Sequence, residues 1–353
     1  MRGLPSTWKH LLLWQVNSLL LTTTGYFSQR IATLGVNAPT AQSAIVYVLL
    51  SLHVFCRCRS TSESVLRWWH WLLLAAADVE ANYLLVLAYQ YTDITSVCIL
   101  DAFTVPTVVV LSCAFFGRRY SLKQLGAAAL CVLGIGALVA SDLLQQGSGD
   151  IKTERPMAWF GDLLVLAGAA LYGCSNVAQE VLLQGKVAGR VEYLAHLGGY
   201  GAFIAIAQSA LLEREAIAAA FDIPTHRTNT TATASMGTLE LLLGLEVGFL
   251  TALCSFYILV AYLLDTGSSA TTMNLSLLTS DFWAVLVGVG LLHAKPGLWY
   301  VCAFALTVSG LLLYHLTTPP AGRSSGALIN AEEESTAGGA SEAQEHVTPY
   351  ASA

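Results

Sequence analysis

The chain has 353 residues, of which 55% are hydrophobic and 11% are charged, and its formal net charge is −6. A charged fraction so far below the roughly 25% of an average soluble domain excludes an ordinary soluble globule, which needs a charged shell around its core. One arginine and five glutamates place −4 of the net charge on residues 319–353. The remainder is close to neutral and has no basic surplus of the kind that nucleic acid binding requires.

Ten apolar segments follow one another along the chain, and each is long enough for a helix that crosses a hydrocarbon core of roughly 30 Å. The mean hydropathy of +0.60 supports the same interpretation. The first segment exceeds the apolar core of a signal peptide, so it is read as a span. The sequence predicts an all-α integral membrane protein with spans at residues 7–29, 39–56, 68–91, 94–117, 120–144, 159–182, 191–212, 238–263, 269–292 and 297–317.

Lysine and arginine are distributed unevenly between the two sides that ten spans define. The side that holds both termini carries eleven of these bases, and the opposite side carries six. Because short cytosolic loops are enriched in Lys and Arg, we expect a multi-pass protein with both termini in the cytosol. The sequon Asn229-Thr230-Thr231 then lies on the non-cytosolic side, which makes Asn229 a glycosylation candidate. The plasma membrane and an endomembrane both stay open as its location.

The two halves of the chain share a weak internal repeat. Ala88-Tyr89 and Thr95-Ser96 recur at a 173-residue offset as Ala261-Tyr262 and Ser268-Ser269. Because each half contains an odd number of spans, the second copy must enter the membrane from the opposite side, as in transporters that bind their substrate between two inverted halves. The predicted divisions are a first five-helix repeat at 1–144, a linker at 145–158, a second five-helix repeat at 159–318 and a disordered acidic cytosolic tail at 319–353.

Four acidic residues lie well inside predicted spans: Asp78, Glu80, Asp101 and Asp281. A carboxyl group at such a depth costs about 2.5–3.5 kcal/mol on insertion scales, so each one needs a cavity or a partner. Lys and Arg are missing from comparable depths in the predicted spans, and we therefore expect a neutral or negative cavity. A carrier of nucleotide sugars, by contrast, requires a cation inside its cavity to bind the phosphates of the substrate.

The span at 68–91 cannot direct both of its acids into one cavity. At 100° per residue, Asp78, Asn82 and Tyr89 share one face of the helix, whereas Glu80 and Tyr91 lie on the opposite face. Either face is a candidate for the substrate route, and the face with Glu80 and Tyr91 is narrowly favoured.

Two later spans carry polar side chains along one face. Tyr172 and Asn176 share a face in 159–182, and Asn274 and Asp281 share a face in 269–292. These groups are expected to point inward, either to contact a substrate or to form hydrogen bonds between helices.

Proton coupling is expected to use a buried acid, because desolvation disfavours the charged form of a carboxyl group. The candidates are Glu80, Asp101 and Asp281, with Asp101 as the first choice. Its counterpart at the 173-residue offset is Asn274, so that only one half of the repeat carries an ionisable group at this position.

Three residues are expected to shape the helices around these groups. Pro106 follows Asp101 by about one turn and is expected to kink its span, because proline cannot donate a backbone hydrogen bond. Gly134 and Gly136 are expected to permit close helix packing rather than the approach of a ligand.

Three blocks of residues resemble one known family. They are Ala77-Asp78-Val79-Glu80-Ala81-Asn82-Tyr83-Leu84, then Gly161-Asp162-Leu163-Leu164, then Asn274-Leu275-Ser276-Leu277-Leu278-Thr279 with Asp281. The chain resembles the F branch of solute carrier family 35, within the drug/metabolite transporter superfamily, from about residue 5 to 318. The resemblance implies a ten-helix inverted-repeat carrier whose central cavity is built by helices one to four and six to nine.

These observations together predict a secondary-active transporter of a small organic solute, neutral or cationic and nucleobase-like or amine-like, that works by alternating access. Two alternatives stay open: a nucleotide-sugar antiporter of endomembranes, and a membrane scaffold or sensor that does not transport. We expect no enzyme activity, because the literal GxGD at 147–150 lies in a polar linker. We expect no cofactor, metal or nucleic acid; the expected partners are the lipid bilayer and the small-molecule substrate, with a homodimer left open.

Overall fold

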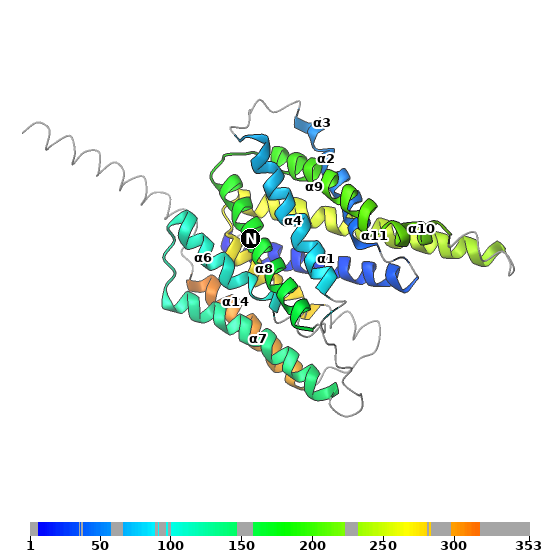
Figure 1. The fold of residues 1–353 in the computed structure, drawn as a ribbon. Helices are drawn as coiled ribbons and strands as arrows, with labels where there is room; N and C mark the ends of the chain where they lie inside the picture. The colour runs from blue at the N-terminus through cyan, green and yellow to red at the C-terminus, as the bar shows by residue number, and fades with distance from the viewer. Residues whose placement is uncertain are drawn as a thin grey trace, which may run out of the picture.

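A computed structural model of the chain is helical throughout the part that it describes, as Figure 1 shows. The described residues are 6–34, 36, 38–57, 66–88, 91, 97, 100–146, 158–222, 232–280, 282–283 and 298–317. Four positions or segments of interest, namely Tyr89, Asn229, Asp281 and the tail at 319–353, lie outside them.

A helix lies within each of the ten expected segments. The helices are α1 (Ser6–Thr33), α2 (Pro39–Ser51), α3 (Val54–Arg57), α4 (Trp68–Ala88), α6 (Thr104–Phe116), α7 (Leu122–Gln146), α8 (Ala158–Gln184), α9 (Arg190–Leu212), α10 (Arg214–Asp222), α11 (Ala232–Asp265), α12 (Ala270–Leu277) and α14 (Leu298–Thr317). Helix α10 lies in the region expected to be a loop between two spans.

Four helical stretches in the described residues are long and apolar enough to cross a bilayer: Trp68–Ala88, Trp159–Gln184, Arg190–Leu212 and Glu240–Asp265. Shorter apolar helices add to them at Thr104–Phe116, Leu122–Gly134 and Ala305–Thr317. The apolar surface of these helices is typical of a protein whose solvent is lipid.

The segment expected as one span at 94–117 contains a break. Ala102 and Phe103 form a turn, and α6 begins directly after them at Thr104. Pro106 lacks the N–H that a continuous helix would direct to the carbonyl of Ala102, so the helix restarts rather than bending. Asp101 is the last residue before this turn.

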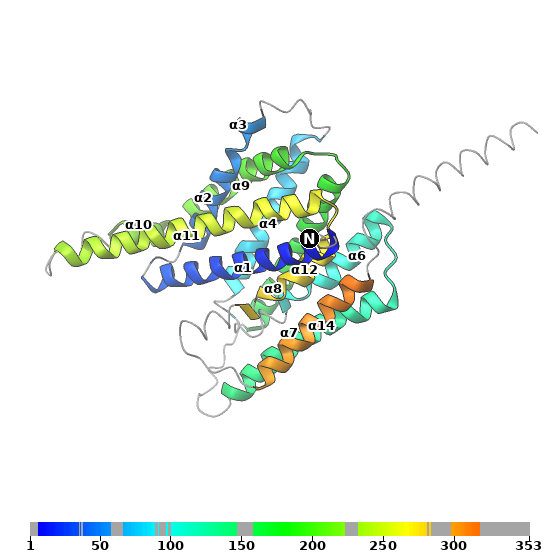
Figure 2. The same cartoon turned by 180° about the vertical axis from the view of Figure 1, so that it is seen from behind.

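The helices pack in pairs that combine distant parts of the chain. Helix α1 lies along α11, α2 lies on α9, and α4 lies on α8. Figure 2 shows the long α1 and α11 side by side, with α7 and α14 forming a separate pair at one edge of the molecule. The central core is filled by large buried side chains that include Trp14, Tyr47, Trp71, Tyr193 and Leu197.

Glycine lets α7 and α14 approach closely. A Cβ atom at Gly310 would stand 2.8 Å from the backbone oxygen of Ala127 and 2.8 Å from the backbone nitrogen of Cys131. A Cβ atom at Gly134 would stand 2.0 Å from Oγ1 of Thr307. The expectation of close packing is therefore confirmed at Gly134. It is wrong at Gly136, where a Cβ atom would meet nothing within 4 Å.

This difference predicts opposite effects for two alanine substitutions. Gly136→Ala is expected to be neutral or stabilising by up to about 1 kcal/mol, because alanine favours a helix over glycine. Gly310→Ala is expected to destabilise by about 1–3 kcal/mol, since the methyl group must separate two helix backbones. Thermal unfolding of the purified variants measures both changes, and equal shifts for the two would contradict the close contact.

Candidate functional site

Asp78 lies at the centre of a polar cluster between four helices. It stands ten residues from each end of α4, which is about 15 Å at the rise of an α-helix, and is 3% exposed. Its Oδ2 accepts hydrogen bonds from Tyr47 Oη of α2 at 2.7 Å and from Tyr257 Oη of α11 at 2.8 Å. Its Oδ1 accepts a third from Ser175 Oγ of α8 at 3.3 Å. A single carboxyl group thus joins α2, α4, α8 and α11 about midway along α4.

The donors to Asp78 are all hydroxyl groups, so these contacts hold the carboxyl without neutralising a charge on it. The two tyrosine hydroxyls also lie 3.2 Å from each other, so either one can direct its single proton to the other hydroxyl in place of Asp78. An uncompensated carboxylate accepts hydrogen bonds from ammonium or amide donors more strongly than a neutral oxygen does. The cluster is therefore suited to bind a cation or a hydrogen-bond donor.

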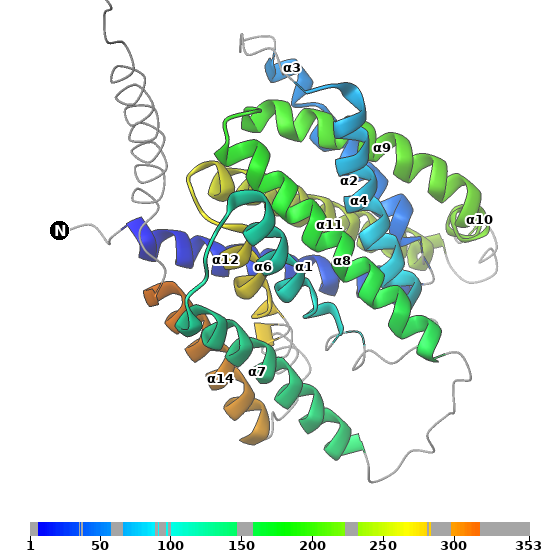
Figure 3. The same ribbon diagram turned by 60° about the vertical axis from the view of Figure 1, so that its left-hand side comes forward.

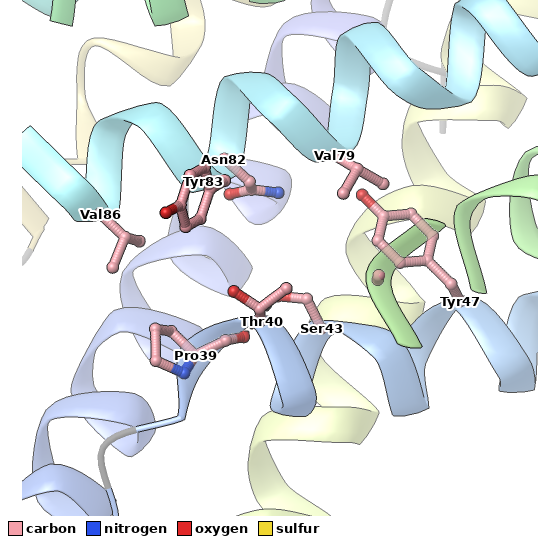
Figure 4. A pocket seen from close by; sticks show the side chains of 9 residues that line it. Pro39, Thr40, Ser43, Tyr47, Val79, Asn82, Tyr83 and Val86 are labelled. Atoms are coloured by element: carbon pink, nitrogen blue, oxygen red, sulfur yellow. Dashed lines mark hydrogen bonds between the residues drawn. The ribbon is translucent and has the colours of Figure 1, made fainter. Parts of the chain in front are cut away.

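A small cavity lies beside this cluster, between α2 and α4. Figure 4 shows Thr40, Ser43 and Tyr47 on α2 facing Asn82 and Tyr83 on α4. Its volume is about 30 Å³, which is roughly the room that one water molecule occupies in the liquid. Pockets for organic ligands are about ten times larger, so this cavity is too small to hold an organic solute.

Three amide side chains make further contacts between helices. Asn82 Oδ1 accepts a hydrogen bond from Tyr172 Oη at 2.7 Å, which joins α4 to α8. Asn176 Nδ2 donates to Asn274 Oδ1 at 3.0 Å, and Asn274 in turn donates to the backbone oxygen of Ala270 at 2.7 Å. The predicted residues Asp78, Asn82, Tyr172, Asn176 and Asn274 are thus brought together as contacts between helices.

The opposite face of α4 has different surroundings. Glu80 is half-buried, and its Oε2 accepts a hydrogen bond from Gln208 of α9 at 3.4 Å. The ring of Tyr91 meets the edge of Phe160 with centroids 5.2 Å apart. On α4 the small cavity is lined by Val79, Asn82, Tyr83 and Val86, and neither Asp78 nor Glu80 is among its lining residues.

A buried ion pair lies at one end of the helix bundle. Glu180 of α8 has 0% exposure, and its Oε1 lies 2.5 Å from Arg118 Nη2. Its Oε2 accepts a hydrogen bond from the backbone N–H of Ala270 at 2.8 Å, in the first turn of α12. Gly117, with φ at +59°, ends α6 and places Arg118 directly after it.

This ion pair corrects the expectation of an interior with acids alone. Arg118 lies in the connection after α6, where a count of charges inside spans does not find it, yet its guanidinium reaches a buried carboxylate. The charge of Glu180 is therefore matched by a cation, whereas the groups that donate hydrogen bonds to Asp78 are uncharged hydroxyls. Sequence reasoning also missed Tyr47 and Tyr257, whose aromatic character is typical of ordinary core positions.

Further contacts close the same end, which we call the Arg190 side because α9 begins there. The hydroxyl of Ser268 accepts a hydrogen bond from Trp14 Nε1 at 2.6 Å. The backbone oxygen of Ser268 accepts another from Gln184 Nε2, also at 2.6 Å. Asp265 pairs with both Lys186 and Arg190. These contacts join α1, α8, α9 and α11, so this end has several polar connections between helices.

The opposite end, which we call the Glu213 side, is held by a helix cap. The two carboxylate oxygens of Glu213, just after α9, accept hydrogen bonds from the backbone N–H groups of Thr40 and Ala41, each at 2.9 Å. An acid at a helix N-terminus satisfies free N–H groups and interacts favourably with the helix dipole. The small cavity beside the Asp78 cluster includes Thr40, so it lies toward this side.

Comparison with known proteins identifies the family of the chain. A family model described as "Solute carrier family 35" matches residues 5–316. The chain belongs to solute carrier family 35. It is 35% identical over 321 residues to mouse "Solute carrier family 35 member F2", covering 87% of this chain and 79% of that protein. The same-named Xenopus tropicalis protein is 33% identical over 319 residues, covering 86% and 75%.

Two further similarities extend the comparison. An uncharacterized solute carrier family 35 member of Schizosaccharomyces pombe is 33% identical over 316 residues, covering 88% of this chain and 58% of that protein. A protein of known crystal structure has a similar fold, with a TM-score of 0.64 at 15% identity, over 88% of this chain and 99% of that one. Family membership and the apolar helices of the chain indicate a membrane protein. They point to a solute carrier rather than to an enzyme.

Proposed function

We propose that this protein is a secondary-active transporter that moves a neutral or cationic small organic solute by alternating access, with Asp78 as the carboxyl that meets the solute. The observation that carries the proposal is the carboxyl group of Asp78 at the midpoint of a membrane-length helix, held by hydroxyls from three other helices. Acids within membrane spans are costly and are typical of substrate or ion pathways.

An inverted repeat of two five-helix halves, 1–144 and 159–318, is supported by the way the helices pair. In such a repeat α1 corresponds to α8, α4 to α11, α2 to α9 and α7 to α14. Exchanging the halves then converts the α4–α8 contact into the α11–α1 contact, and both contacts are present. The α2–α9 and α7–α14 pairs convert into themselves, as expected for elements beside a pseudo-two-fold axis.

The closed Arg190 side and the cavity toward the Glu213 side suit an alternating-access cycle. A solute reaches Asp78 only after α2 and α4 separate, since the cavity between them has a volume of about 30 Å³. Release on the other side requires the contacts of Arg118, Ser268 and Asp265 to open. From the excess of lysine and arginine we expect the Arg190 side, the side on which α1 begins, to face the cytosol.

The charge at the centre favours a cation or a hydrogen-bond donor over a nucleotide sugar. The described cation that reaches a buried position, Arg118, is already paired with Glu180. A diphosphate near Asp78 would instead meet a carboxyl group, and like charges repel. Nucleotide-sugar antiport is kept as the alternative that the family name leaves open.

A ligand screen followed by an uptake assay tests the proposal. The purified protein is heated with single compounds from a panel of amines, nucleobases and nucleotide sugars, since a ligand at 100 times its dissociation constant stabilises by about 2.7 kcal/mol. Compounds that raise the unfolding temperature are then offered to proteoliposomes with and without the protein. Uptake of an amine or nucleobase supports the proposal. Selective uptake of nucleotide sugars contradicts it, and binding without uptake indicates a scaffold or sensor.

A further inference from the structure

A groove of about 970 Å³ lies on the Arg190 side and is distinct from the cavity beside Asp78. It is bordered by α9 and α11, with Leu20 of α1 and His53 after α2 completing its wall. Figure 3 shows α11 between α9 and α1, and α11 contacts both helices. Lys186, Arg190 and Asp265 lie at its mouth.

The depth of the groove matches one leaflet of a bilayer. Arg190 and Asp265 are the terminal residues of two membrane-length helices, so both lie at the same membrane interface. The groove extends along α11 from Asp265 to Ser255. Ten residues of α-helix span about 15 Å, which is half of a hydrocarbon core of roughly 30 Å.

Below its mouth the groove is lined mostly by apolar side chains, with His53 and Ser255 as polar members. Ile258 is 44% exposed and Tyr262 is 40% exposed, and both face the groove together with Leu20 and Leu259. Exposed apolar side chains at this depth suit an acyl chain, because a polar solute would find few hydrogen-bonding partners there.

The groove is lined by two cations and two carboxylates, and the cations are the more exposed of these groups. Lys186 and Arg190 both pair with Asp265, so one carboxylate is shared by two cations whose side chains are 68% and 46% exposed. Glu192 also borders the groove, but it is buried, and its Oε1 lies 4.0 Å from His196 Nε2. The N-terminus of α9 adds positive partial charge beside Arg190.

We propose that this groove binds one anionic phospholipid, with its phosphate at Lys186 and Arg190 and an acyl chain along α11. The charge at the mouth selects an anionic headgroup, and the apolar wall one leaflet deep selects a lipid rather than a free anion. Basic sites between helices at the cytosolic interface bind anionic lipid headgroups through the same two features. The inference requires that the chain spans a membrane, and it does not depend on which solute is carried.

Native mass spectrometry of the full chain in detergent, with equal amounts of phosphatidylglycerol and phosphatidylcholine, tests this inference. One phosphatidylglycerol is expected to stay bound in preference to phosphatidylcholine. Removing both cations with Lys186→Gln and Arg190→Gln is expected to weaken its binding about 30-fold, and either change alone about 5-fold. Arg119→Gln with Lys123→Gln is the matched control, because both residues are exposed, precede or begin α7, and lie outside the groove.

Two further variants keep the result interpretable if loss of both cations perturbs folding. Asp265→Asn retains both cations and is expected to strengthen binding of phosphatidylglycerol. Ile258→Trp fills the groove without changing its charge and is expected to weaken binding. Equal retention of the two lipids, an equal loss in the matched control, or displacement of the lipid by soluble glycerol phosphate would overturn the proposal.

Discussion

Arg118→Leu is expected to destabilise the protein by about 3–5 kcal/mol, because it leaves the carboxylate of Glu180 buried without a cation. Glu180 is fully buried, and its remaining hydrogen bonds come from the N–H of Ala270 and the side chain of Gln184. These neutral donors do not replace the charge of the guanidinium that the carboxylate loses. Thermal or denaturant unfolding of the purified variant measures the loss.

Two comparisons isolate the ion pair from general effects of the substitution. Arg119→Leu removes an identical side chain from the next position, which is exposed, and is expected to change stability by less than about 0.5 kcal/mol. Adding Glu180→Gln to Arg118→Leu is expected to recover most of the loss, since a neutral amide still accepts the hydrogen bond of Ala270. If Arg118→Leu and Arg119→Leu were equally stable, the ion pair between Arg118 and Glu180 would not stabilise the fold.

Asp78→Asn is expected to reduce solute uptake by about 10-fold to 100-fold while the protein stays folded. A hydrogen bond to a charged group contributes about 1.5–3 kcal/mol, and the asparagine amide has no charge. Its oxygen still accepts from Tyr47 or Tyr257, so the four-helix contact persists in part. Initial rates of uptake into proteoliposomes, together with the unfolding temperature, separate the two effects.

The controls for Asp78 differ in one property each. Glu240→Gln removes an acid from the exposed end of a membrane-length helix and is expected to leave uptake unchanged. Tyr257→Phe keeps the carboxyl group but removes one donor to it, so its effect is expected to be smaller than that of Asp78→Asn. Uptake by Asp78→Asn at the wild-type rate would exclude this carboxyl from the binding site.

Much of the architecture was predictable because hydrophobic runs and breakers act locally. The expected segments contain helices, and the angular argument correctly separated Asp78, which is buried, from Glu80, which is half-buried on another face. The break before α6 follows from Pro106, although the expected kink becomes a restart of the helix. Family membership was also accessible, because its motifs are contiguous in sequence.

Contacts between distant segments were not predictable in the same way. Tyr47 and Tyr257 are 210 residues apart, and periodicity alone does not reveal that both hydroxyls meet one carboxylate. Arg118 was placed in a loop, since only the turn at Gly117 and the packing of α6 on α8 bring it to Glu180. In both cases, for hydroxyls within helices and for a charge at a chain connection, the partner is reached through tertiary packing.

Reversible cross-linking of the closed Arg190 side tests alternating access most directly. In this structure Gln184 Nε2 lies 2.6 Å from the backbone oxygen of Ser268. Cysteines are introduced at these two positions by Gln184→Cys and Ser268→Cys, and the two thiols are joined with a cleavable cross-linker. Single-cysteine variants treated in the same way control for modification of the native cysteines. The proposed cycle predicts that cross-linking abolishes solute uptake into proteoliposomes and that reductant restores it. Uptake at an undiminished rate by the cross-linked double variant would contradict a cycle in which this side must open.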